Sequence, residues 1–309
     1  MTWSEVTCNL APAYILFAQH GWADDNQAMT RLANELLTED DRTQIVVPCL
    51  GYLQTWMRIE PLIQAVEAIA TPYLQAYPTT PIKIIGHSMG GLIWLELLNR
   101  HPDWWQRIHS LVLVASPVGG ADLGRLIDPF NLGIGIASDL GKNRRLIAER
   151  IATEIPTLVI AGDWDGGSDG TVTIECTKVA HTQFVCLPGL SHPVLRDHTH
   201  VIATIRQFWE DQKIGDRILA DPVIQQIRSV PGMTDGHWRD FYRGRVLFEL
   251  KTGETLRLWK SPFGIYHIFV ASPSGDCLYA GFVGWFHTVE LRQALKQIAA
   301  EHGASSLNP

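Results

Sequence analysis

Up to about residue 210, the chain alternates short apolar runs with segments whose apolar residues recur at helical spacing. The apolar runs are continuous, as is typical of strands that are covered on both faces. Strands that alternate with helices indicate βαβ units and a parallel sheet. The strands predicted in this way are Tyr14–Ala18, Gln44–Pro48, Ile82–Gly86, Ile108–Ala115, Thr157–Ala161 and Gln183–Leu187.

The helical segments between these strands carry apolar stripes. From Met29 to Leu37, apolar residues recur at i, i+3, i+4, i+7 and i+8, which is the spacing of one helix face. The segment Gly91–Asn99 is apolar on nearly all sides, and this predicts a deeply buried helix. It should end at His101, because the residue before a proline avoids the helical region. We therefore expect an α/β domain over residues 1–211.

One connection is far longer than the others. Roughly forty residues separate the strand that ends near Pro117 from the strand that begins at Thr157, whereas connections in α/β units have about 2–6 residues. Apolar, helix-compatible pieces occur around Leu123–Ile127 and Leu140–Ile151. Because long ordered insertions are enriched in function, residues 118–152 are interpreted as a helical cap or lid. A structural excursion over the edge of the sheet is the alternative interpretation.

After residue 211 the pattern changes to aromatic-rich runs that come in two pairs, each flanking a polar turn. Such pairs predict two hairpins. Helix-like segments precede and follow them, at Asp216–Ser229 and from Leu291 to Ala299. The strands predicted here are Arg245–Leu250, Thr255–Trp259, Tyr266–Ala271 and Cys277–Val283.

Residues 212–309 are therefore interpreted as a small α+β module of unknown role that contains no catalytic motif. A domain of about ninety residues is only marginally stable alone, and exposed hairpin edges promote association. We expect the module to pack against the first domain or against another copy of the chain. A homo-oligomer formed through this module is one form of that expectation.

The composition is that of an ordinary globular protein, with 46% hydrophobic and 18% charged residues. A net charge of −7 argues against nucleic acid or an anionic membrane as the main partner. The apolar run at Tyr14 has no basic leader, and no run reaches the ~20 residues of a transmembrane helix. Five cysteines without a C-x-x-C pair indicate buried free thiols in a reducing compartment. We expect no transmembrane segment and a cytoplasmic location.

The strongest chemical signal is Gly86-His87-Ser88-Met89-Gly90-Gly91, between a predicted strand and an apolar helix. A serine hydroxyl needs a base to take its proton and donors to receive the developing charge. A tight strand-to-helix turn lifts the hydroxyl above the sheet and points the next backbone N–H, that of Met89, at the oxyanion. Glycines at 86 and 90 are needed because side chains there would collide with backbone. The pattern predicts that Ser88 is a nucleophile.

With this motif in its strand–turn–helix context, residues 10–211 resemble the α/β-hydrolase superfamily, nearest its lipases and esterases. The resemblance implies a minimal six-stranded, mostly parallel sheet, with nucleophile, acid and histidine in that order along the chain. It implies that His192, after the strand that ends near Leu187, accepts the Ser88 proton and returns it to the leaving group. It also implies that the N–H of Trp22 is the second oxyanion donor.

The resemblance places the acid in the loop after the fifth strand, where three aspartates occur. Asp169 has the family's Asp-x-x-Val spacing, whereas Asp165 matches another arrangement, Gly-Asp-x-Asp at the strand end. We assign the acid to Asp169, with Asp165 and then Asp163 as alternatives. A calcium site is disfavoured because Gly167 breaks the EF-hand spacing. No metal and no cofactor are expected.

These residues predict a serine hydrolase that cleaves a carboxylic ester through an acyl-Ser88 intermediate. The expected substrate is a small molecule with an apolar acyl group, lying between Trp22, Met89 and the insertion 118–152. Thioester or amide cleavage, or acyl transfer, would use the same triad. A third hypothesis is a non-catalytic binding protein on a hydrolase scaffold. It is disfavoured because a retired site has no physical reason to keep all three groups.

Overall fold

The computed structural model describes residues 11–38, 41–120, 136–215, 221–303 and 305–306. Six parallel strands in the first part of the chain form one sheet, in which the first strand lies between the second and the third. The strands are β1 (Tyr14–Gln19), β2 (Thr43–Val46), β3 (Ile82–His87), β4 (Ile108–Val114), β5 (Thr157–Asp163) and β6 (Gln183–Pro188). Their order is β2-β1-β3-β4-β5-β6, and all neighbours run parallel.

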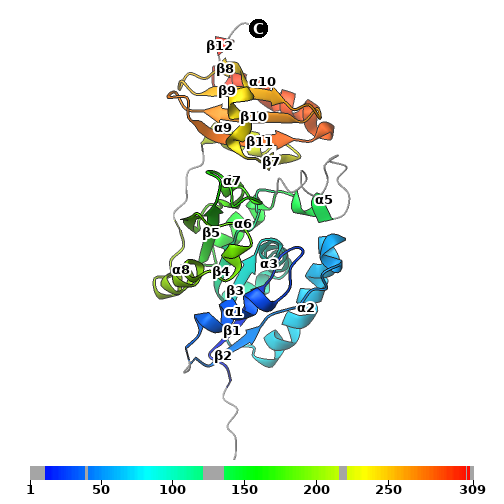
Figure 1. Ribbon diagram of the computed structural model, residues 1–309, viewed down its shortest axis with the longest axis vertical. Coiled ribbons are helices and arrows are strands. Elements are labelled where there is room, and N and C mark those ends of the chain that lie inside the picture. Colours follow the sequence, from blue (N-terminus) through cyan, green and yellow to red (C-terminus); the bar gives the residue numbers. More distant parts are fainter. Residues whose placement is uncertain (1–10, 39–40, 121–135, 216–220, 304, 307–309) are drawn as a thin grey trace, which may run out of the picture.

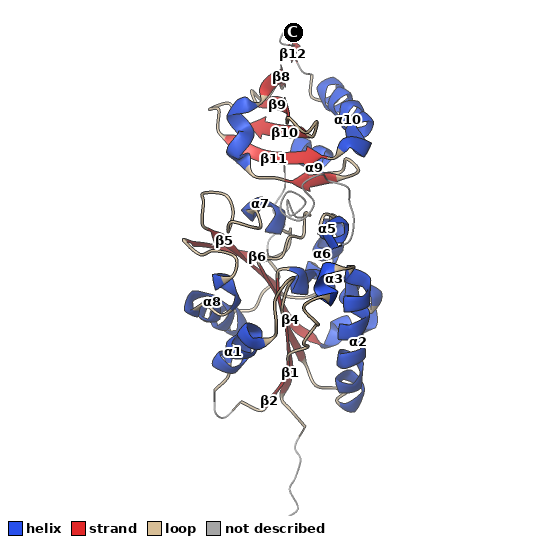
Figure 2. Ribbon diagram, turned by 45° about the vertical axis from the view of Figure 1, so that its right-hand side comes forward, coloured by secondary structure: helices blue, strands red, loops and turns tan. Residues whose placement is uncertain are grey.

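Helices cover both faces of this sheet (Figure 2). On one face, α1 (Gln27–Leu36) and α8 (Thr199–Glu210) contribute to one apolar core. On the other face, α2 (Ile59–Ala76), α3 (Met89–Arg100) and α6 (Arg145–Ala152) contribute to a second core. Coverage on both faces explains why the strands read as continuous apolar runs. The predicted six-stranded α/β architecture is confirmed.

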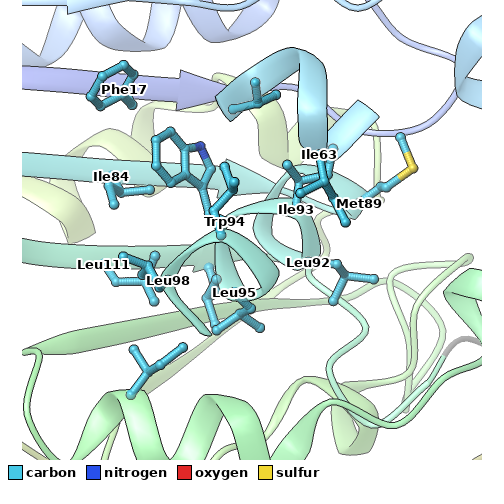
Figure 3. Packing of buried hydrophobic residues seen from close by; sticks show 14 of the residues in the cluster. Phe17, Ile63, Ile84, Met89, Leu92, Ile93, Trp94, Leu95, Leu98 and Leu111 are labelled. Carbon is cyan, nitrogen blue, oxygen red and sulfur yellow. The ribbon is translucent and has the colours of Figure 1, made fainter. Parts of the chain in front are cut away.

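The α3 helix lies at the centre of the larger core. Residues around its whole circumference are buried, including Leu92, Ile93, Trp94 and Leu95. Figure 3 shows these side chains between the sheet and the neighbouring helices, with the Trp94 ring near Phe17 at 5.0 Å between centroids. A helix that is apolar on all sides is stable only where such contacts surround it. This burial fixes the position of the first turn of α3, which follows Ser88.

The described part of the insertion packs into the hydrophobic core of the first domain. Short α5 (Ile136–Leu140) is tied to the start of α2 by the buried Asp139 carboxylate, which accepts hydrogen bonds from the Ile59 N–H at 3.1 Å and from Arg58 Nε at 3.0 Å. Helix α6 packs beside α3 in the same apolar cluster. Residues 121–135 lie outside the described residues, so the predicted lid function of 118–152 stays a prediction.

The last part of the chain forms a second, antiparallel sheet with the order β12-β8-β9-β10-β11-β7. Both predicted hairpins are present in it. The short edge strands β7 and β12 were not predicted, because two or three residues carry no measurable periodicity. The strands are β7 (Met233–Asp235), β8 (Arg245–Glu249), β9 (Thr255–Lys260), β10 (Tyr266–Ala271), β11 (Cys277–Val283) and β12 (Ser305–Ser306).

Helices cover this second sheet on both sides. Helices α9 (Pro222–Arg228) and α10 (Thr288–Glu301) share one apolar cluster with it, and η4 (Trp238–Arg243) packs Phe241 into a smaller one. Helix α9 occupies the later part of the helix expected over Asp216–Ser229. The remaining short helices are η1 (Gln54–Trp56), η2 (Pro102–Arg107), α7 (Ile174–Thr177), η3 (Val194–Arg196) and η5 (Trp285–His287).

The module made by the second sheet packs against the first domain. This is one of the two arrangements expected from the sequence. Strand β7 faces α7 at the end of the parallel sheet where β5 terminates (Figure 1). Every helix in the described ranges is too short or too polar to cross a bilayer. The four described cysteines are free, but Cys49 is exposed. The prediction that it is buried is wrong, because it lies three residues beyond the end of β2.

Candidate active site

Ser88 lies in a strained turn between β3 and α3. Its backbone has φ 54° and ψ −123°, a conformation that costs a residue with a side chain of order 1–3 kcal/mol. The turn is tight enough that a Cβ at Gly86 would overlap the backbone of Gly91, and one at Gly90 would overlap the carbonyl of Gln19. Both predicted glycine positions are therefore required by close approach. The strain is maintained by the buried helix that follows.

Two residues whose backbone N–H groups could bind an oxyanion, Met89 and Trp22, lie next to Ser88 or in a loop against it. Met89 is the first residue of α3, so its N–H has no partner within the helix. The loop after β1 lies directly against the serine, since a Cβ at Gly21 would be 2.8 Å from Ser88 Cβ and 3.3 Å from Ser88 Oγ. Trp22 follows Gly21 in that loop, and its N–H donates no hydrogen bond within the described residues. Within the described residues, neither N–H group has a hydrogen-bond acceptor, which is compatible with the predicted role as oxyanion donors.

His192 lies beside the serine turn and is held by Asp169. The Asp169 Oδ2 atom accepts a hydrogen bond from His192 Nδ1 at 2.7 Å, a length typical of charge-assisted pairs. The carbonyl of His192 accepts from His87 Nε2 at 3.2 Å, and the two rings lie 4.8 Å apart. No hydrogen bond joins Ser88 and His192 in the described part of the chain; such bonds often form only when substrate is bound.

Among the three aspartates, only Asp169 contacts His192 within the described residues. Its carboxylate is buried, and Oδ1 accepts from the N–H groups of Thr171 at 2.9 Å and Val172 at 2.7 Å, which fixes the carboxylate orientation. Asp165 accepts from Ser168 N and Ser168 Oγ, both at 2.8 Å. Asp163 Oδ1 accepts from two N–H groups of its own loop. Asp163 and Asp165 thus bond to groups of their own loop, as short acidic side chains do in turns, and Asp165 also faces His237 Nε2 at 3.3 Å.

Two further histidines next to the site are buried and fit a neutral form. His20 accepts the Leu50 N–H at Nε2 (3.0 Å) and contacts the Gly21 carbonyl through Nδ1 (3.0 Å); burial lowers its pKa. Burial, and then the charge of nearby His192, hold the pKa of His87 well below 6.5. His87 Nδ1 has no partner among the described residues. His20 thereby ties the loop that carries Trp22 to the segment after β2.

This burial predicts a loss of stability in acid. The pKa of His87 is depressed by burial in the folded state, so the unfolded chain binds more protons below about pH 6.5. The free energy of unfolding should therefore fall as the pH is lowered through 6.5, by up to about 1.4 kcal/mol per pH unit for this group. Urea unfolding of the wild type and of His87→Asn at pH 7.5 and 5.5 measures it. An equal pH dependence in both proteins would contradict the prediction.

One feature of the site was missed by sequence reasoning. The loop before α2 exposes four large apolar side chains, and one of them, Trp56, packs edge-on against Trp22 at 4.4 Å between ring centroids. The Thr55 hydroxyl in the same loop accepts the Ala23 N–H at 3.1 Å. The signal was an apolar cluster outside any helix or strand predicted from the sequence, which marks a surface for apolar contact. The four residues are Tyr52, Leu53, Trp56 and Met57.

The chain is similar to one protein family and to several solved structures. A family model described as serine aminopeptidase, S33, matches residues 50–132. A lipase of Bacillus licheniformis in its propeptide form has 12% identity and a TM-score of 0.50, over 88% of this chain and 71% of that chain. Its mature form has 12% identity and a TM-score of 0.49, over 65% and 93%. A protein of Listeria innocua has 17% identity and a TM-score of 0.49, over 66% and 96%. No curated protein sequence matches.

Within the described residues, no group of three or more histidine, cysteine, aspartate or glutamate side chains is arranged to hold a metal ion. The parallel sheet places the strained serine turn after β3, the aspartate after β5 and the histidine after β6. This order along the chain, the family-model match and the shared fold agree with one another. The chain therefore has an α/β-hydrolase fold.

Proposed function

We propose that the protein is a serine hydrolase that cleaves carboxylic esters through an acyl-Ser88 intermediate. The observation that supports this most is that a strained Ser88 (φ 54°) lies in the turn next to His192. The Nδ1 atom of His192 is hydrogen-bonded to Asp169 Oδ2 at 2.7 Å. Strained turns of this kind persist where the surrounding structure over-determines them, and they cluster at functional sites. Nucleophile, base and orienting acid are the three parts that acyl transfer requires.

In the proposed reaction, Ser88 Oγ attacks the ester carbonyl carbon while His192 Nε2 takes the hydroxyl proton. The carbonyl oxygen becomes an anion that the N–H groups of Met89 and Trp22 stabilise. Collapse breaks the bond to the alkoxide, which receives the proton from His192 and leaves as an alcohol. Water then attacks the acyl-serine with the same histidine as base, releasing the carboxylic acid and restoring Ser88.

The proposed substrate class is an ester with an uncharged, apolar acyl group. The exposed apolar loop of Tyr52, Leu53, Trp56 and Met57 adjoins Trp22, beside the proposed oxyanion donor. Such a surface favours apolar chains over charged ones. Thioesters carry the same acyl groups and would use the same three residues, so they are included in the proposal as alternative substrates.

A fluorophosphonate probe tests the proposal. We expect covalent labelling of the folded protein at one site, because the probe reacts only with a serine whose proton is removed by a base. Peptide mapping should locate the adduct on Ser88. Prior labelling should also abolish hydrolysis of a short p-nitrophenyl ester.

The Ser88→Ala protein is the control and should remain unlabelled. Refusal of the probe by folded wild-type protein would favour the competing hypothesis, a binding protein on a hydrolase scaffold. Labelling at a different serine would contradict the assignment of the nucleophile.

A further inference from the structure

The loop that carries Asp169 is held from two sides. On its inner side, Asp163 Oδ1 accepts the N–H groups of Gly166 and Gly167 at 2.7 and 2.9 Å. The N–H of His192 then donates to the carbonyl of Asp169 at 2.9 Å. These bonds connect the loop to β5 and to the proposed base. They do not involve the carbonyl of Gly166 or the carboxylate of Asp165, and both of these groups also have partners outside the loop.

Those outer partners come from the C-terminal module. Trp238 Nε1 donates a hydrogen bond to the Gly166 carbonyl at 2.6 Å. His237 Nδ1 accepts the Arg239 N–H at 2.9 Å, which leaves Nε2 as the donor toward Asp165 Oδ1 at 3.3 Å. The two rings lie directly on the loop backbone, since a Cβ at Gly167 would be 2.7 Å from Trp238 Nε1 and 3.0 Å from His237 Nε2.

A buried ionic cluster fixes the module next to the same loop. Asp235, two residues before His237, is 1% exposed and pairs with Arg145 of the insertion and with Arg228 Nε at 3.3 Å. Burial lowers the pKa of the Arg228 guanidinium, but the charges of Asp235 and Glu175, with other nearby groups, together raise the pKa overall. Arg228 also binds Glu175 of α7 at 2.7 Å. Removing one partner of such a buried pair would leave an uncompensated buried charge, which is strongly destabilising.

The loop between β5 and α7, which carries Asp169, is called the acid loop. The C-terminal module therefore contacts both the turn of the acid loop and α7, the helix that follows this loop. Glu175 lies in α7, whose N-terminal cap is Thr173, four residues beyond Asp169. We propose that Trp238 and His237 are positioning residues that hold the loop so that Asp169 orients His192. This inference rests on the proposed function, in which His192 is the base. It makes the C-terminal module a structural part of the active site, although it contributes no reacting group.

The test uses two tryptophans of the module that make the same kind of bond. Trp238 is 41% exposed and Trp285 is 47% exposed; Trp285 Nε1 donates to the carbonyl of Phe263, within the module, at 2.8 Å. Trp238→Phe should lower kcat on a short p-nitrophenyl ester by about 10-fold to 100-fold with KM unchanged, because small displacements of catalytic groups have effects of this size. Trp285→Phe should keep the wild-type kcat.

A second pair of variants probes His237. His237→Ala should lose kcat in the same way, whereas His237→Gln, which retains a donor for Asp165, should recover most of it. The two His237 variants also test the inference if Trp238→Phe does not fold. A wild-type kcat in Trp238→Phe and in His237→Ala, or an equal loss in Trp285→Phe, would overturn the inference.

A readout without substrate separates this inference from the proposed function. The proton between His192 Nδ1 and Asp169 should give an NMR resonance that Asp169→Asn removes. In Trp238→Phe and His237→Ala, we expect this proton to exchange with solvent at least about ten times faster than in Trp285→Phe. Equal exchange would overturn the inference even if the wild type hydrolyses esters. Faster exchange in a protein without esterase activity would support the positioning role and contradict the proposed function instead.

Discussion

Replacing Ser88 with alanine should lower kcat on p-nitrophenyl esters by about 10⁶-fold while the protein folds normally. In the proposed mechanism, the hydroxyl is the group that forms a bond to the substrate, so its removal would leave only the proposed oxyanion donors and the binding surface to act. Alanine retains the Cβ that the strained backbone at Ser88 already accommodates, and the buried α3 helix is unchanged. Steady-state kinetics, with circular dichroism to verify folding, measures this effect.

The matching control is His192→Ala, which should lose a comparable amount. Residues that act as one unit show non-additive losses, so the double variant should be hardly worse than either single variant. A larger, additive loss in the double variant would mean that the two side chains act independently. Near-wild-type turnover in Ser88→Ala would contradict the central proposal.

Much of the fold could be predicted from the sequence, because its signals are local. The six parallel strands were found as continuous apolar runs, and the deep burial of α3 followed from an apolar segment without a polar face. The end of β2 was placed two residues too late, at Pro48. A proline has no N–H to donate to a sheet, and it should have ended the strand in the prediction.

Some residues of the candidate site could be predicted from the sequence, whereas others could not. The glycines around Ser88 carry a steric requirement that the sequence displays directly. The choice between Asp165 and Asp169 depends on how a loop with two consecutive glycines folds, and spacing alone left both open. The contacts of His237 and Trp238 with that loop join positions more than seventy residues apart. No periodicity or motif reports such a contact, so the module was expected to dock but not at the acid loop.

The second large effect on kcat is expected when Asp169, the carboxylate assigned to His192, is replaced. Asp169→Asn should lower kcat by about 10⁴-fold with little change in KM. Asparagine can keep its side-chain oxygen on the N–H groups of Thr171 and Val172, where Asp169 Oδ1 now lies. Its amide nitrogen would then take the place of Oδ2 against His192 Nδ1. An amide N–H donates, so it favours the histidine form with its proton on Nε2, which cannot accept the proton of Ser88.

Asp165→Asn is the matched control, because it makes the same chemical change four residues earlier in the same loop. Its oxygen can still accept the Ser168 N–H, which Asp165 Oδ1 now accepts at 2.8 Å. We expect a loss of less than about ten-fold, since only the charge facing His237 is removed. Kinetics of both variants on one ester distinguishes the two carboxylates. A large loss in Asp165→Asn with a small one in Asp169→Asn would reverse the assignment. Large losses in both would indicate that the loop acts as one unit, so that the charge on Asp165 matters for holding Asp169 against His192.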